Sequence, residues 1–182
     1  QKRFNIQADI VTYGKVLGGG LPIGVVAGKS KFLDAIDGGF WQYGDQSFPE
    51  VKSTFVAGTF CHHPLAMAAS LKTLEILDST DDNLLEKINT RTEDFCKRMN
   101  AYFKENSLKL SIVYFGSLFR FVTPGKHKEL YNQLLLNGVY VWEGRNCFLS
   151  ASHTDEVVAL LEDKIKLSCK ELLEAGIIKA KV

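Results

Sequence analysis

A single lysine, Lys15, stands where a short strand gives way to a run of glycines. The β-branched and aromatic residues 10–13 predict a short buried strand that ends at Gly14. The glycines at 18–20 allow the backbone to adopt positive φ and to approach a bound group closely. A lysine amine that is desolvated at such a strand end loses its proton more easily and becomes a nucleophile. The spacing alone also fits a solvated lysine before a flexible turn.

Two stretches of the chain, TYGKVLGGGLPIG (residues 12–24) and AGTFCHHPLAMAAS (residues 57–70), resemble the class III aminotransferases that depend on pyridoxal phosphate. They are most similar to the glutamate-1-semialdehyde aminomutase branch. The resemblance implies that the amine of Lys15 binds the cofactor covalently and acts in catalysis. It also implies that Thr59 reaches the cofactor phosphate of the neighbouring subunit. On this basis we expect a homodimer with the site at the subunit interface.

The segment GVYVWEGRNCFLSASHTDE (residues 138–156) bears on the substrate. It resembles aminotransferase domains of hybrid polyketide and nonribosomal peptide synthetases, which aminate a keto acyl chain on a carrier protein. Relatives that act on free amino acids often carry an arginine in a late strand of the small domain to hold the carboxylate. The matching residues 147–150 include no arginine, and Arg145 precedes them in a turn. Because a thioester has no carboxylate, we expect a carrier-bound keto acyl substrate and an amino donor.

Two other interpretations remain open. One is a stand-alone glutamate-1-semialdehyde aminomutase, which is an isomerase. The other is a catalytically inactive fragment that serves as a dimerising scaffold, although the presence of both Lys15 and Thr59 argues against it. A carrier or condensation domain upstream of the chain would favour the synthetase interpretation over the aminomutase.

The resemblance also implies a fold. It is that of the C-terminal part of a fold-type I pyridoxal-phosphate-dependent transferase, α/β followed by α+β. We expect the end of the large cofactor-binding domain in residues 1–60, a linking helix in 61–80 and a small α+β domain in 81–182. A domain rarely begins only about nine residues before a buried strand, and the large domain of the resembled family has a long stretch before this lysine. We therefore expect the chain to be the C-terminal part of a larger protein.

Local patterns predict the individual elements. Val25–Ala27 should form a second short strand, residues 40–54 an aromatic-rich loop, and residues from Pro64 onward a buried helix that is apolar on nearly all sides. A helix should begin at Asp82, capped by Asp81 or Asp82, with its apolar stripe at residues 84, 88, 92, 95, 99 and 102. Strands are expected at 108–114 and 117–122, a helix at 126–136, and a hairpin of strands at 139–142 and 147–150. Thr154 should cap the last helix, whose inner residues are 158, 161, 165 and 172.

Composition excludes several classes of function. The 182 residues are 46% hydrophobic and 24% charged with a formal charge of +1, so neither nucleic acid nor a membrane is expected as a partner. Four widely spaced cysteines without a CxxC pair fit a reducing, cytoplasmic location and no zinc site. Residues 24–30, GVVAGKS, lack the spacing of a phosphate-binding loop, and the glycines at 18, 20 and 24 miss the dinucleotide fingerprint by one residue.

Overall fold

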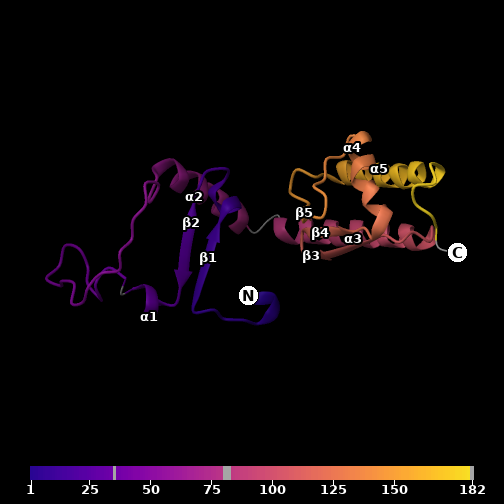
Figure 1. The fold of residues 1–182 in the computed structure, drawn as a ribbon. Coiled ribbons are helices and arrows are strands. Elements are labelled where there is room, and N and C mark those ends of the chain that lie inside the picture. The colour runs from indigo at the N-terminus through magenta and orange to yellow at the C-terminus, as the bar shows by residue number, and fades with distance from the viewer. Residues whose placement is uncertain (35, 80–82, 181–182) are drawn as a thin grey trace. The chain divides into compact units, whose positions relative to one another are not determined.

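The computed structural model describes residues 1–34, 36–79 and 83–180 of the chain. By their internal contacts these residues divide into two compact units, 1–80 and 81–182 (Figure 1). Each unit combines helices with strands. No helix in the described part of the chain is both long and apolar enough to span a membrane.

The first unit is built around a pair of antiparallel strands. Its elements are η1 (Lys2–Phe4), β1 (Ile10–Gly14), η2 (Lys15–Gly18), β2 (Gly24–Gly28), α1 (Ser30–Leu33) and α2 (Pro64–Asp78). The pairing runs from Ile10 opposite Gly28 to Gly14 opposite Gly24, so the glycine turn closes the ribbon beside Lys15. Residues 40–54 contain neither helix nor strand, as predicted, and α2 begins at Pro64, where the proline ring suits the first helical turn.

Burial in the first unit differs from the prediction. Among its described residues, Ala66 is the only buried hydrophobic side chain. Ile10 and Tyr13 of β1 are 51% and 49% exposed, and Leu65 of α2 is 66% exposed, so the expectations of a buried strand and a buried helix are wrong for this chain. The physical reason is that the β1–β2 pair has no third strand beside it among the described residues.

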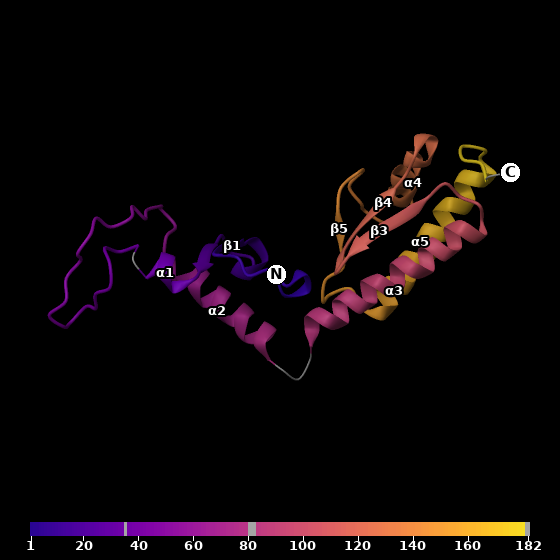
Figure 2. The same cartoon turned by 90° about the horizontal axis from the view of Figure 1, so that it is seen from below.

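The second unit is a three-stranded antiparallel sheet with helices on one face. Its elements are α3 (Leu84–Glu105), β3 (Ser111–Phe115), β4 (Leu118–Val122), η3 (Gly125–Glu129), α4 (Leu130–Leu136), β5 (Cys147–Phe148) and α5 (Asp155–Glu174), and the strand order is β3-β4-β5. Figure 2 shows the long helices α3 and α5 running beside the sheet. The expected cap of α3 at Asp81 or Asp82 lies outside the described residues.

Aromatic side chains join the helices to the sheet. Phe95 of α3 meets Phe119 of β4 edge-on, with 5.3 Å between ring centroids, and Tyr131 of α4 meets Phe121 in the same way at 6.3 Å. Since Phe119 and Phe121 point to the same face of β4, both helices cover that face. The predicted stripe of α3 is confirmed at its centre, where Ile88, Thr92, Phe95 and Met99 are buried.

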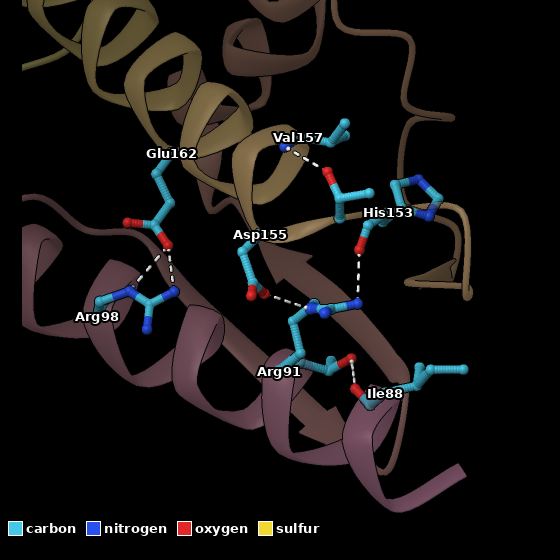
Figure 3. Close-up of polar contacts among 9 residues, drawn as sticks. Ile88, Arg91, Arg98, His153, Asp155, Val157 and Glu162 are labelled. Carbon is cyan, nitrogen blue, oxygen red and sulfur yellow. Dashed lines mark hydrogen bonds and ion pairs between the residues drawn. The ribbon is translucent and has the colours of Figure 1, made fainter. Parts of the chain in front are cut away.

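Ion pairs connect α3 to α5 at the edge of this core (Figure 3). Arg98 donates to Glu162 Oε1 from Nε at 2.9 Å and from Nη2 at 2.6 Å, which raises the pKa of Arg98. Arg91 Nε lies 2.6 Å from Asp155 Oδ1, and its Nη1 donates to the His153 carbonyl at 2.8 Å. Thr154 caps α5 as predicted, because its Oγ1 accepts from the Val157 amide.

The predicted hairpin of residues 139–142 and 147–150 is wrong. Residues 139–142 form no strand, and β5 pairs with β4 instead, Cys147 opposite Phe119 and Phe148 opposite Leu118. The turn itself exists, since the Arg145 amide donates to the Trp142 carbonyl at 3.1 Å. Val139 and Val141 pack against the core without a ladder of hydrogen bonds, and their residue types do not distinguish this from a strand.

Truncating the central aromatic of this core tests the packing. Phe95→Ala should lower the free energy of unfolding of the second unit by about 3–5 kcal/mol, because it leaves a cavity against Phe119. Leu85→Ala, on the exposed side of the same helix, should change it by less than about 0.5 kcal/mol. Urea unfolding of the 182-residue chain followed by helical circular dichroism measures both. Equal unfolding midpoints for the two variants would contradict this packing.

Candidate active site

Lys15 occupies a strained backbone position. It follows β1 directly and has φ of +53°, in the left-handed region that residues with a Cβ seldom adopt. This conformation costs about 1–2 kcal/mol for a residue other than glycine, asparagine or aspartate. Such strain persists only where the surroundings impose it, and it is concentrated at functional sites. Since His62 and Ser107 also have positive φ, the conformation supports Lys15 as a functional candidate together with its sequence motif.

The amine of Lys15 is available to a ligand. Its side chain is exposed, and within residues 1–34, 36–79 and 83–180 it makes neither a hydrogen bond nor an ion pair. Lys29, at the end of β2, contrasts with it, because its Nζ lies 2.6 Å from Asp9 Oδ1. Lys15 thus has no acidic partner among the described residues, whereas Lys29 forms an ordinary surface ion pair.

The glycine turn after Lys15 lies directly against α2. Gly19 has φ of +59°, and a Cβ at this position would lie 2.8 Å from Thr73 Oγ1 and 3.1 Å from the Ala69 carbonyl. Thr73 Oγ1 itself donates to that carbonyl at 2.9 Å. The backbone of the turn therefore lies against the Ala69 carbonyl and the Thr73 hydroxyl, with no room for a side chain at Gly19. Sequence reasoning did not single out Ala69 and Thr73, although the small residues of AMAAS could have indicated a close approach.

Thr59 is exposed in the segment that precedes α2. It lines an open groove of about 880 Å³ whose walls include Val25 of β2, Val56, Phe60 and Met67 of α2. Its hydroxyl has no hydrogen-bond partner in the described residues, and it does not cap α2, whose N-cap is His63. Lys15 is not among the groove residues. The groove reaches Gly24, which pairs with Gly14 next to Lys15, so Lys15 lies near the groove without lining it.

Arg145 is the one other cationic side chain that the sequence singled out. Its guanidinium carbon lies 4.9 Å from the centroid of the Trp142 ring, in a cation–π contact within the second unit. The strand that follows is shorter than predicted, and its residues Cys147 and Phe148 carry no charge. No cluster of metal-ligating side chains occurs among the described residues, and all four cysteines are free.

The chain matches the family model described as "Aminotransferase class-III" over residues 1–153. Similar curated proteins are two glutamate-1-semialdehyde 2,1-aminomutases, 31% identical from Sulfurisphaera tokodaii and 33% identical from Sulfolobus acidocaldarius. Each alignment covers 94% of this chain and 42% of the relative. The chain therefore spans less than half the length of the curated relatives it matches.

Solved structures with the same fold are transaminases. One is described as "Transaminase with PLP bound", with a TM-score of 0.76, 25% identity and coverage of 96% of this chain and 41% of that one. Another is a β-phenylalanine aminotransferase from Variovorax paradoxus, with a TM-score of 0.78, 19% identity and coverage of 99% and 42%. These neighbours confirm the predicted fold class, part of a fold-type I transferase with mixed α/β content.

Adding one methyl group tests the contact between the glycine turn and α2. In Gly19→Ala the new Cβ would collide with Ala69 and Thr73. The amides of α2 should therefore exchange hydrogen about tenfold faster, which corresponds to a loss of roughly 1.4 kcal/mol of local stability. Gly20→Ala is the matched control, because Gly20 also has positive φ but an added Cβ would meet nothing within 4 Å. Hydrogen exchange of the peptide covering residues 64–78 gives the readout. The same acceleration in both variants would refute a specific contact.

Proposed function

The chain belongs to the class-III aminotransferase family, and from this premise we propose that the protein containing it is an aminotransferase in which Lys15 binds pyridoxal phosphate. The observation that carries the proposal is the geometry of Lys15: an unpaired amine on a strained residue, held between a strand end and a glycine turn. A site that presents one lysine in this way suits a covalently bound aldehyde cofactor.

The cofactor and the lysine divide the chemistry. When bound, pyridoxal phosphate supplies the electron sink that stabilises negative charge on the carbon next to the transferred nitrogen. Lys15 Nζ would hold the cofactor between turnovers and, once displaced by the amino donor, would hold and move a proton as general acid and base. An arginine could not substitute, because a guanidinium does not lose its proton.

Thr59 is proposed to serve the cofactor site of the partner subunit in a homodimer. The hydroxyl of Thr59 is unpartnered among the described residues, and Lys15 does not line the groove of Thr59. Both observations support an arrangement in which Lys15 and Thr59 of one chain serve two different cofactor sites. The exposed apolar side chains of the first unit also support it. Val16, Phe55 and Phe60 would be covered by further protein surface, from the rest of the polypeptide or from a second subunit.

For the substrate we propose a keto acyl chain bound to a carrier protein, with a separate amino donor. The support is the strand β5, which offers no cation to hold a free carboxylate, and Arg145, whose guanidinium is stacked on Trp142. The second candidate is a glutamate-1-semialdehyde 2,1-aminomutase, which is supported by the names of relatives that are 31–33% identical.

Mixed dimers test the proposed roles of Lys15 and Thr59 together. In the full-length protein, Lys15→Ala should abolish turnover, and Thr59→Val should weaken cofactor binding at least about tenfold by removing one charge-assisted hydrogen bond. A purified dimer of one subunit of each variant regains one intact site if the sites are shared. At limiting cofactor it should therefore have about half the wild-type activity.

The outcome of the mixed dimer separates shared from unshared sites. If Lys15 and Thr59 acted within one subunit, the mixed dimer would have no more than the average activity of its two parent dimers. Lys31→Ala, on the exposed helix α1, is the control for removing a lysine of the first unit, and it should leave turnover unchanged.

Substrate competition tests the carrier-bound assignment. A keto acyl chain presented as a carrier thioester should have a kcat/KM at least about tenfold above that of the free keto acid, because the site lacks a partner for the carboxylate. Assays of the full-length protein with both substrates and a common amino donor measure the ratio. A ratio near one, or isomerisation of glutamate-1-semialdehyde without any donor, would favour the aminomutase instead.

A further inference from the structure

The second unit contains a groove of about 650 Å³, and its lining includes none of the residues proposed for the cofactor site. Three chain segments form it: Lys109 just before β3, residues 124–127 after β4, and residues 176–180 after α5. All of them lie in residues 83–180, so the groove belongs to one compact unit. We call it the lysine groove.

The charge of the lysine groove is of one sign. Lys109, Lys126 and Lys179 line it, all three are exposed, and none has a hydrogen bond or an ion pair within the described residues. No aspartate or glutamate is among its lining residues. Three ammonium groups around one groove repel one another, and an anion with more than one charge would relieve that repulsion.

A buried histidine under the groove lacks a partner. His127 is 8% exposed, and its Nδ1 lies 3.1 Å from the Pro124 carbonyl, which can only accept, so Nδ1 carries the hydrogen. Its Nε2 is buried and has no hydrogen-bond partner in the part of the chain that the structure describes. Because Nε2 is buried from solvent, it offers a ligand in the open groove no direct contact, and the lysines are the groups that remain to bind one.

The chemistry of a ligand that suits the groove follows from the charge of its lining residues. A phosphate monoester carries about two negative charges near neutral pH, which suits several lysines acting as point charges. Its oxygens accept hydrogen bonds from the ammonium groups of the lysines. The groove is larger than a phosphate ion, and the apolar side chains of Pro124 and Ile177 line the rest of it.

We propose that the lysine groove binds a small organic phosphate monoester. Lys109, Lys126 and Lys179 hold the phosphate, and the organic part lies against Pro124 and Ile177. The site lies in the second unit and involves neither Lys15 nor Thr59. It therefore stands independently of the proposed aminotransferase function.

Titration of the isotope-labelled 182-residue chain with phenyl phosphate at constant ionic strength tests the proposal. We expect saturable changes in the NMR signals of residues 124–127 and 176–180. Lys179→Gln should weaken binding at least about tenfold, the effect of losing one charge-assisted contact. Lys128→Gln removes the same charge from an exposed neighbour outside the groove, and it should leave binding unchanged.

The choice of probes separates the sources of phosphate. Inorganic phosphate should bind at least about tenfold more weakly than phenyl phosphate, because it lacks the apolar part. Equal affinity of the two probes would overturn the assignment to an organic ester. Tighter binding of benzoate or of a short oligonucleotide, an unaltered affinity in Lys179→Gln, or changes spread over all exposed lysines would overturn the site itself.

Discussion

The close approach of the Gly19 backbone to helix α2 holds in place the glycine turn that follows Lys15. The turn meets the Ala69 carbonyl and Thr73 Oγ1 at distances that leave no room for a side chain. Lys15 directly precedes this turn and adopts a positive φ that only a well-held backbone maintains. The backbone position of Lys15 therefore depends on helix packing, and its amine makes no polar contact among the described residues.

The two units differ in how far they are self-sufficient. The second unit has its own core, in which Phe95, Phe119, Phe121 and Tyr131 join helices to one face of the sheet. The first unit buries hardly any apolar side chain among its described residues, although its sequence is rich in them. Since the strand, the glycine turn and the Thr59 groove all belong to the first unit, the proposed cofactor site depends on additional protein surface for its completion.

Sequence patterns predicted the features that depend on local residues. The stripe of α3, the Thr154 cap and the start of α2 at Pro64 follow from spacing and capping preferences. Features that depend on distant partners escaped prediction. The residue types of 139–142 do not distinguish a strand from a segment that packs on a core, and the exposure of β1 reflects what lies beside it. The positive φ of Lys15 has no signal in residue type.

Covalent trapping of the cofactor tests the central claim most directly. The full-length protein is loaded with pyridoxal phosphate, reduced with borohydride, digested and analysed by mass spectrometry for a phosphopyridoxyl lysine. The account predicts that the label is confined to the peptide carrying Lys15, and that Lys15→Ala removes it while Lys31→Ala does not. Labelling that is scattered over exposed lysines, or that persists unchanged in Lys15→Ala, would contradict the account.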